Sequence, residues 1–527
     1  MIVYFRTDAS SYIGSGHVMR CITLAEELNN LGVSVVFITL NCQGNLNQYI
    51  RNKGFKISPI STTIPDNFKD TNNSKNTGIW SNEQLNKDAE ETIRLLNKEK
   101  PNWLVIDHYS IDITWENRLR PYVEKIMVID DLANRQHSCD LLLDQNYTHN
   151  RNRYSHLLNP SVTKLLGPQY ALLRKEFTVD QPEFEKNKLI ENIFIFFGGS
   201  DPGNLTGITL KALTYCKINY SNIDVVIGSS NCHKKEVTSL VEKLHKATLY
   251  EQVDNISDLM RKADISLGAG GTSTWERMVI GLPSIVVTIA DNQVPSIKDL
   301  DKDNYLIWIG NANRVSKSII CNALSDAIQN YDDLKEMSQK GKKLVSRLGS
   351  RTVAKILSTG PDKDTLFVRE SVYSDYLLYW YWVNDPAVRN NSFKQQDIAL
   401  KDHQVWFENC LDNPNTILLV IESNLSAIGQ VRFDYFDSYY TIDYSISRQF
   451  RGFGLGRVVL SRAIDYLKKY GSFTLIGDIK ESNLASCKVF EQVGFTEIFC
   501  KSIKNVRRYK LQYSMNKFTK GKMGKIR

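Results

Sequence analysis

The chain has 527 residues, of which 42% are hydrophobic and 24% charged, and its formal net charge is +8. At about 100–200 residues per domain, this length predicts roughly three domains of ordinary globular composition. No apolar run approaches the ~18 residues of a membrane-spanning helix, and Arg6 and Asp8 argue against a signal peptide. Nine cysteines without a C-x-x-C pair are typical of free thiols in a reducing cytoplasm. The eight histidines lack metal-ligand spacing, so we predict no protein-held metal.

The first candidate site lies near the amino end of the chain. Residues 2–5 predict a buried strand, and apolar residues in 18–31 recur at the spacing of one helix face. Between them lie Gly14, Gly16 and His17. The glycines let the backbone approach a ligand, and the partial positive charge at a helix N-terminus favours a neutral imidazole, which suits a general base. A histidine that only caps or packs is the alternative, and the spacing matches neither a dinucleotide-binding nor a Walker loop.

Polar residues follow further predicted strands in this part of the chain. Residues 33–40, 103–106 and 126–129 predict buried strands separated by helices, and the last two run into Asp107-His108 and Asp130-Asp131. The carboxyl ends of parallel strands share one edge of a sheet. The pattern therefore predicts a parallel sheet with a site along that edge.

A second αβ segment follows a charged, polar stretch at 174–188, which we interpret as a linker, just as we interpret 62–78 as a surface loop. Buried strands are predicted in this segment at residues 193–197, 223–227, 264–267 and 284–289. Glycine-rich turns follow the first and third of them, at 198–201 and 268–273. Two such halves predict two Rossmann-like domains facing a cleft, and such clefts commonly hold a nucleotide or a nucleotide sugar.

The turn at 270–273 suits a diphosphate, because small residues, backbone N–H groups and hydroxyls meet at a helix start. Glu276 could bind ribose hydroxyls. The pattern Ser273-x-x-Glu276 is also a capping box, which would explain both residues without a ligand. The residues alone leave both interpretations open.

A third domain is predicted after residues 358–362. Strand-like runs at 417–421, 429–433 and 440–446 lie close together, which favours antiparallel neighbours. Residues 451–456 then form a glycine-rich loop between a predicted strand and a predicted helix, the order found in phosphate-binding sites. A strand–helix turn that binds no ligand has the same sequence pattern. The predicted domain bounds are 1–178, 179–360 and 361–515, followed by a basic tail at 516–527 that we interpret as frayed.

Several sequence blocks resemble the UDP-sugar hydrolases of the pseudaminic acid pathway. They are Arg6-Thr7-Asp8-Ala9, Ile13-Gly14-Ser15-Gly16-His17, Met19-Arg20-Cys21 and the blocks at 129–132, 143–146, 197–200, 270–276 and 290–293. The resemblance covers about residues 1–360 and implies a glycosyltransferase-B arrangement of the two Rossmann-like domains. It also implies hydrolysis of UDP-2,4-diacetamido-2,4,6-trideoxy-β-L-altropyranose at the anomeric carbon, without a metal.

The resemblance assigns roles to individual residues. It makes His17 the base that deprotonates the attacking water, places Glu276 on the ribose, and places Asn292 and Gln293 on the sugar. It assigns binding of the diphosphate to Gly271, Thr272 and Ser273. The remaining residues predicted to bind substrate are Asp8, Gly14, Gly16, Arg20, Gly199, Ser200 and His403. Asp8 could equally orient the local backbone, and a lone helix histidine such as His403 is more often a surface residue.

Residues 366–515 resemble the Gcn5-related N-acetyltransferases (GNAT). The pattern Arg451-x-x-Gly454-x-Gly456 matches that family's pyrophosphate loop for acetyl-CoA, and residues 483–495 match its next helix and strand. The resemblance implies a set of acetyl-CoA contacts: Arg451, Gly452, Phe453, Gly454, Leu455, Gly456, Asn483 and Ser486. Residues 382–392 look like the subgroup that acetylates UDP-4-amino-4,6-dideoxy-N-acetyl-β-L-altrosamine.

Two positions depart from the acetyltransferase pattern. Relatives often carry Arg where Val383 stands, so one polar substrate contact is missing or moved. Position 490 is often a Tyr that protonates the departing thiolate, and Phe490 has no hydroxyl to do so. Tyr444, Tyr509, Tyr513 or a water could take its place.

We therefore predict a cytoplasmic bifunctional enzyme of pseudaminic acid synthesis, an α/β chain with an α+β acetyltransferase domain at its end. Its partners would be a UDP-sugar and the cosubstrate acetyl-CoA, with neither nucleic acid nor membrane. A glycosyltransferase, in which the same base deprotonates an acceptor hydroxyl, is the second hypothesis. A nucleotide-sugar-binding protein with an inactive acetyltransferase domain is the third. A related bacillosamine or legionaminic-type sugar is an alternative substrate.

Overall fold

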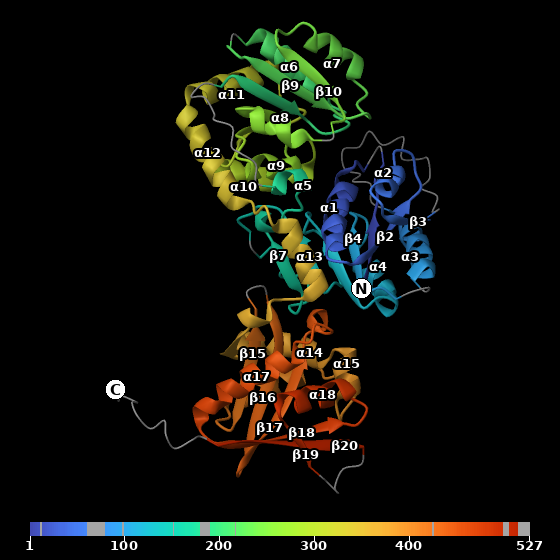
Figure 1. Cartoon of the computed structure of the whole chain (residues 1–527), viewed down its shortest axis with the longest axis vertical. Helices are drawn as coiled ribbons and strands as arrows, with labels where there is room; N and C mark the ends of the chain where they lie inside the picture. The colour runs from blue at the N-terminus through green and yellow to red at the C-terminus, as the bar shows by residue number, and fades with distance from the viewer. Residues whose placement is uncertain are drawn as a thin grey trace, which may run out of the picture. The chain divides into compact units, whose positions relative to one another are not determined.

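A computed structural model describes residues 1–10, 13–60, 80–96, 100–150, 152–179, 190–216, 218–253, 255–423, 426–498 and 505–514 (Figure 1). The chain divides into two compact units. The first contains Met1–Leu157 and Leu165–Ser358, and the second contains Leu158–Lys164 and Thr359–Arg527. The predicted loop at 62–78 and the basic tail at 516–527 lie outside the described residues. The four predicted domain bounds stay predictions.

The chain begins with a seven-stranded sheet in the order β3-β2-β1-β4-β5-β6-β7, whose last strand is shared between the two units. Its strands are β1 Ile2–Thr7, β2 Ser34–Leu40, β3 Lys56–Ile60, β4 Trp103–Asp107, β5 Lys125–Ile129, β6 Leu141–Asp144 and β7 Thr163–Leu166. Parallel pairing from β3 to β6 confirms the predicted parallel sheet. β4 and β5 are buried along their whole length, as expected for strands covered on both faces.

Within the described residues, the helices between these strands are α1 Gly16–Asn30, α2 Asn47–Asn52, α3 Asn82–Leu96 and α4 Ile113–Leu119. α1 confirms the helix predicted from apolar spacing, because Val18, Cys21 and Leu28 are fully enclosed. Leu31 lies just past the helix end and is 39% exposed. His17 therefore lies in the first turn of α1, after β1 and the glycine-rich turn, as predicted.

The second half of the first unit has a six-stranded sheet in the order β10-β9-β8-β11-β12-β13. Its strands are β8 Asn192–Phe196, β9 Asn222–Ile227, β10 Ala247–Glu251, β11 Ile265–Ala269, β12 Ser284–Thr288 and β13 Ile307–Asn311. All neighbours are parallel. The four predicted strands are confirmed to within about two residues, whereas the sequence analysis missed the two edge strands, β10 and β13.

The helices of this half are α5 Lys175–Thr178, α6 Leu205–Tyr215, α7 Lys234–Val241, α8 Ile256–Lys262, α9 Ser273–Val279, α10 Val294–Lys302, α11 Lys317–Gln329, α12 Tyr331–Leu344 and α13 Gly349–Thr359. The start of the predicted linker is thus wrong, because α5 forms there and buries Phe177 completely. Cys216 and Cys321 form a disulfide, so the expectation of free thiols is wrong for this pair.

The last helix of the first unit returns to its first sheet. Trp103 in β4 is buried, and its indole Nε1 donates a hydrogen bond to the carbonyl oxygen of Leu357 at 3.0 Å. A polar N–H at the end of a large apolar side chain needs such a partner when buried. Residues 254 positions apart therefore meet, and α13 belongs with the first half in space although it follows the second half in sequence.

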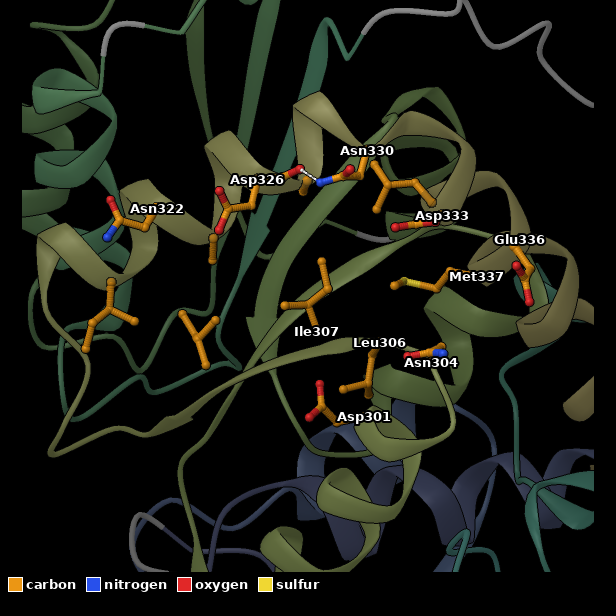
Figure 2. A pocket seen from close by; sticks show the side chains of 15 residues that line it. Asp301, Asn304, Leu306, Ile307, Asn322, Asp326, Asn330, Asp333, Glu336 and Met337 are labelled. Atoms are coloured by element: carbon orange, nitrogen blue, oxygen red, sulfur yellow. Dashed lines mark hydrogen bonds between the residues drawn. The ribbon is translucent and has the colours of Figure 1, made fainter.

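A cavity of about 540 Å³ lies beside the edge strand β13, between α10, α11 and α12 (Figure 2). Apolar side chains such as Ile307 and Met337 line it together with four acids, Asp301, Asp326, Asp333 and Glu336. None of its lining residues is a predicted site residue. The cavity is therefore separate from the candidate site described below.

The second unit contains a mixed seven-stranded sheet in the order β14-β15-β16-β17-β18-β20-β19. Its strands are β14 Phe367–Glu370, β15 Thr416–Glu422, β16 Ala427–Phe436, β17 Tyr439–Ile446, β18 Phe473–Lys480, β19 Thr496–Ile498 and β20 Val506–Tyr513. Its helices are α14 Tyr376–Val383, α15 Pro386–Asn391, α16 Leu400–Asp412, α17 Gly456–Leu467 and α18 Leu484–Val493. β17 and β18 are parallel and the other neighbours antiparallel, which confirms the predicted fold class. None of the helices described here is long and apolar enough to cross a membrane.

Candidate functional site

His17 and Arg20 in α1 meet Asp107 at the carboxyl end of β4. His17 Nδ1 lies 2.6 Å from Asp107 Oδ1, and Arg20 donates from Nε to Oδ2 and from NH2 to Oδ1, each at 2.6 Å. A second aspartate, Asp131 after β5, accepts from Arg20 NH1 at 3.1 Å. The site predicted along this sheet edge is thus a compact group in which two aspartates and one arginine surround one imidazole.

The carboxylate fixes the tautomer of His17. Burial alone would raise the pKa of Asp107, but the charges and hydrogen bonds of Arg20 and His17 outweigh it and hold that pKa well below its usual range. An ionised carboxylate only accepts hydrogen bonds, so Nδ1 carries the hydrogen and donates it to Oδ1. The lone pair then lies on Nε2, which is the acceptor position that a general base needs.

Tyr109 connects this group to the second half of the first unit. Its ring packs edge-on against His17, with ring centroids 4.4 Å apart. Its hydroxyl donates to Asp131 Oδ2 at 3.3 Å and accepts from Asn292 Nδ2 at 2.9 Å. Asn292, a predicted sugar contact, lies in the short helix η4 Asp291–Gln293. The predicted base and a predicted sugar contact are therefore separated by a single tyrosine side chain.

Asp107 and Tyr109 are site residues to which the sequence patterns gave no functional role. Both residues come directly at or after the carboxyl end of β4, where the sequence analysis noted Asp107-His108 as polar residues at a strand end. Their position at the carboxyl end of a predicted strand was the signal in the sequence that could have identified them as site residues. Which of these polar residues faces His17 depends on the register of β4 against β1, in which Asp107 lies beside Thr7.

Asp8 is enclosed and supports the backbone of the site. Its Oδ1 accepts from the Leu40 backbone N–H at 2.7 Å and pairs with Arg6 NH1 at 2.7 Å, and its side chain has no exposed surface. Its Oδ2 lies 3.5 Å from His108 Nε2. Burial lowers the pKa of His108 to about 3, although Asp8 opposes the shift. These contacts favour the interpretation in which Asp8 orients the ends of β1 and β2.

The glycine-rich turn before α9 lies beside Gln293. A Cβ on Gly270 would meet Ile297 Cγ1 at 2.7 Å, so a larger residue there would force the Ile297 side chain to shift, and a Cβ on Gly271 would lie 3.7 Å from Gln293 Nε2. The predicted diphosphate residues Gly271, Thr272 and Ser273 and the predicted sugar contact Gln293 are thus neighbours. All of them are partly exposed, as ligand contacts must be.

Glu276 does not form the capping box that its spacing allowed. In the described structure Thr272 is the N-cap of α9, and no side chain caps it. Glu276 instead receives two hydrogen bonds from Arg174, from Nε at 2.8 Å and from NH2 at 3.1 Å. Capping therefore no longer explains this residue, and the ribose assignment stays a prediction.

Arg277 lies beneath the same turn and is fully buried. Its NH2 donates to the Ala269 carbonyl at 2.8 Å and to Thr274 Oγ1 at 3.2 Å. Among the described residues, no carboxylate forms an ion pair with it, and burial lowers its pKa to about 10. A Cβ on Gly268 would lie only 2.4 Å from Arg277 NH1, so that glycine makes room for the guanidinium. A positive charge thus lies under the predicted diphosphate turn.

The turn after β8 contains the predicted contacts Gly199 and Ser200. Gly198 has φ +96°, a conformation that side chains rarely adopt, and Ser200 is exposed. Asp201 accepts from the backbone N–H groups of Leu205 and Thr206 and so holds the start of α6. In the first half, Gly14 also has a positive φ, +80°, while Gly16 opens α1.

In the second unit the predicted acetyl-CoA loop precedes α17. Gly452 and Gly454 have φ +86° and +67°, and α17 begins at Gly456 without a side-chain cap within the described chain. Arg451 is engaged elsewhere, because its Nε donates to the Ile446 carbonyl at 2.8 Å and its NH1 pairs with Asp385 at 2.7 Å. The loop therefore offers backbone N–H groups, whereas Arg451 anchors it.

The other predicted contacts of this unit differ in exposure. Phe453 is partly buried, and Leu455 is 1% exposed, so the Leu455 side chain belongs to the core. The Asn483 side chain caps α18 by accepting from the Ser486 backbone N–H at 3.3 Å. His403 is 2% exposed and packs on Trp406 and Phe407, so its interpretation as a surface residue is wrong. These residues stay predicted ligand contacts.

The two departures from the acetyltransferase pattern have structural counterparts. Arg389 donates from Nε to the Val383 carbonyl and from NH1 to the Lys394 and Gln396 carbonyls, so a guanidinium shapes this loop from another position. Phe490 is 2% exposed and fills the space that a Cβ on Gly477 would occupy. The ring at position 490 is thus part of the core.

Comparisons with known proteins found a matching protein family in each of the two units. Residues 193–360 match the glycosyltransferase family 28 C-terminal domain, and residues 365–496 match the acetyltransferase (GNAT) domain. The uncharacterized protein MJ1062 of Methanocaldococcus jannaschii is 25% identical over 93% of this chain and 95% of its own length. The crystal structure of MurG from Acinetobacter baumannii is 13% identical, with a TM-score of 0.49 over 68% of this chain and 98% of that one.

A UDP-2,4-diacetamido-2,4,6-trideoxy-beta-L-altropyranose hydrolase of Campylobacter jejuni is 27% identical over 58% of this chain and 98% of its own length. The spore coat polysaccharide biosynthesis protein SpsG of Bacillus subtilis is 28% identical over 36% of this chain and 57% of its own. Together with the fold, these matches define an enzyme in which a glycosyltransferase-B-type nucleotide-sugar unit is fused to a GNAT acetyltransferase that uses acetyl-CoA. The predicted resemblances, to the UDP-sugar hydrolases in the first part of the chain and to the GNAT acetyltransferases in the last part, are thereby confirmed.

Within the described residues, no group of three or more histidine, cysteine, aspartate or glutamate side chains could hold a metal ion. The prediction that the reaction needs no metal stays a prediction.

Proposed function

We propose that the first unit hydrolyses UDP-2,4-diacetamido-2,4,6-trideoxy-β-L-altropyranose and that the second unit N-acetylates the C4 amine of the precursor UDP-sugar. The observation that carries the hydrolytic part is the bond from His17 Nδ1 to Asp107, which leaves Nε2 as a base. The similarity to the Campylobacter hydrolase, which extends over 98% of that protein, supports the substrate. The GNAT match at residues 365–496 supports the acetyl transfer.

In the proposed hydrolysis, a water attacks C1 of the sugar while the bond from C1 to the UDP oxygen breaks. His17 Nε2 takes a proton from the water, and the resulting imidazolium is stabilised by the ionised Asp107. The bond from Nδ1 also holds the ring in one orientation, as a carboxylate does in the catalytic triads of hydrolases. The leaving UDP keeps the electron pair of the broken bond.

The departing diphosphate would be bound at the turn before α9. Backbone N–H groups at 271–273 and the hydroxyls of Thr272 and Ser273 supply donors, and the buried Arg277 supplies a positive charge below them. Fixed donors of this kind stabilise developing negative charge without reorganising, which is why they are effective in catalysis. Glu276 and Asn292 would bind the ribose and the sugar.

The test uses the full chain with the 4-amino UDP-sugar and acetyl-CoA, comparing wild type with His17→Ala. We expect the variant to release CoA at the wild-type rate and to accumulate the UDP-linked diacetamido sugar, because hydrolysis falls about 10²–10⁴-fold without the base. Mass spectrometry and NMR identify the products. Free sugar formed at an undiminished rate by the variant would overturn the assignment of the base.

A glycosyltransferase is the second candidate, and the match of residues 193–360 to a glycosyltransferase domain favours it. In that case His17 would deprotonate an acceptor hydroxyl. Incubating the diacetamido UDP-sugar with the protein alone separates the two candidates. Negligible turnover until an acceptor is added would favour transfer over hydrolysis.

A further inference from the structure

Acetyl transfer from a thioester needs a proton for the departing sulfur. When the amine nitrogen attacks the acetyl carbon and the C–S bond breaks, the sulfur keeps the electron pair as a thiolate. Phe490 has no proton to give, and it is enclosed in the core. The second unit offers Tyr444, Tyr509 and Tyr513 as alternatives, and the structure separates these three.

Tyr509 and Tyr513 are poorly placed to meet a ligand. Tyr509 has 0% exposure, and its hydroxyl donates to Glu491 Oε1 at 3.1 Å, so the proton is already directed to a carboxylate. Tyr513 pairs with Phe473 at the start of β18 and packs on its ring, with centroids 5.3 Å apart. Phe473 precedes Leu475, the first β18 residue that pairs with β17. Tyr513 therefore lies at the opposite end of this pairing from Tyr444.

Tyr444 lies where the sheet opens. The described pairing of β17 with β18 is confined to Tyr440–Leu475 and Thr441–Ile476, although both strands continue for several residues beyond. Beyond these two pairs the register of a parallel ladder, with its evenly spaced hydrogen bonds, does not continue between the two strands. Tyr444 follows the last pair by three residues on β17 and is partly exposed.

The end of β17 is close to the predicted acetyl-CoA loop. A Cβ on Gly456, the first residue of α17, would lie 2.9 Å from Val489 in α18 and 3.7 Å from Ile446 in β17. The start of α17, the helix α18 and the end of β17 therefore converge. A thioester whose pyrophosphate is bound at the 452–456 loop would have Tyr444, two residues before Ile446 on β17, near its path in the proposal that follows.

The Tyr444 hydroxyl is protonated and held in place. It lies 3.1 Å from Ser486 Oγ in the first turn of α18, and its ring centroid is 6.1 Å from that of Phe490. Burial raises its pKa, so the phenol keeps its proton until the departing sulfur develops negative charge beside it. A serine hydroxyl can accept from the phenol or donate to it.

We propose that Tyr444 is the general acid of the acetyl transfer, acting from β17 because position 490 is a phenylalanine. The proposal rests on the acetyltransferase activity proposed above. As the C–S bond breaks, the sulfur takes the Tyr444 proton and leaves as CoA thiol. The attacking nitrogen loses one proton to solvent, and the tyrosinate regains one through Ser486 or solvent, so the overall products are the amide and free CoA.

The test compares wild type with Tyr444→Phe in the full chain, following CoA release with the 4-amino UDP-sugar. We expect kcat to fall about 100-fold while the KM for acetyl-CoA stays within about twofold. With p-nitrophenyl acetate as donor, whose phenolate leaves without a proton, both proteins should react at similar rates. Equal losses with both donors, or no loss with acetyl-CoA, would overturn the proposal.

Tyr509→Phe is the matched control, since it removes a phenol hydroxyl from the same sheet, and its kcat should stay near wild type. The slow hydrolysis of acetyl-CoA without an acceptor breaks the same C–S bond and is measured alongside. A wild type that the UDP-sugar does not accelerate would contradict the proposed substrate. The role of Tyr444 would still be decided by the donor comparison in the hydrolysis assay.

Discussion

The two candidate reactive groups, His17 and Tyr444, both lie near a glycine-rich turn but are supported differently. His17 is backed by the ionised Asp107, and Arg20 neutralises the second oxygen of that carboxylate. The described contact of the Tyr444 hydroxyl is a neutral one, to Ser486. A base gains from negative charge behind it because it must hold a proton, whereas an acid must remain neutral until its proton is needed. The charge of the neighbouring group thus predicts the direction of proton transfer: His17, beside a carboxylate, accepts a proton, and Tyr444, beside a neutral hydroxyl, donates one.

The largest expected effect comes from removing the charge behind His17. Asp107→Asn should lower kcat for hydrolysis by about 10³–10⁴-fold, because the amide can donate to Nδ1 and favour the wrong tautomer. The acetyl transfer of the same protein should be unchanged, which serves as the internal control for folding. Kinetics with the diacetamido UDP-sugar measure the effect. A change confined to KM would show that Asp107 supports binding and not the base.

A smaller effect is expected at the diphosphate turn, where Arg277 is a charge without a described carboxylate partner. Arg277→Met should weaken the binding of UDP about 10–100-fold, or about 1.4–2.8 kcal/mol, and leave uridine binding within about twofold. Isothermal titration of both ligands gives the comparison. Arg277→Lys keeps the charge and should recover part of the UDP affinity. Equal weakening of UDP and uridine would mean that Arg277 only shapes the turn.

The smallest expected effect concerns His108, a buried residue beside Asp8 in the first site. The pKa of His108, lowered by burial to about 3, lies below its unfolded value of about 6.5. Between these values the unfolded chain binds a proton that the folded chain does not, so stability falls as pH decreases from about 6.5 toward 3. His108→Asn should reduce this loss by about 1 kcal/mol per pH unit in that window.

Urea denaturation at pH 7, 6 and 5 measures this dependence, with His245→Asn, which replaces an exposed histidine, as the control. The Asn side chain can still accept from the Ser110 backbone N–H, as His108 Nδ1 does at 3.1 Å. If the His108 variant followed the pH dependence of wild type, the buried histidine would not be neutral as described.

Much of the candidate site could be predicted because its parts are local. A strand, a glycine-rich turn and a helix follow one another within about 30 residues at β1–α1 and again at β11–α9. Apolar periodicity and turn residues encode such units directly. The same local reasoning suggested a capping box at Ser273 and Glu276, and it was wrong because a distant arginine, Arg174, takes the glutamate instead.

The sequence by itself determined the alternation of strands and helices, the glycine-rich turns and the identity of His17 as a candidate base. Tertiary structure alone decided which charges surround that histidine, since Asp107 is 90 residues away and reaches it through the register of β4 beside β1. It also decided that α13 returns to the first sheet and that the ring of Phe490 fills the core. Local spacing fixes secondary structure, but buried polar groups choose partners from the whole chain, because each must be paired wherever the packing brings it.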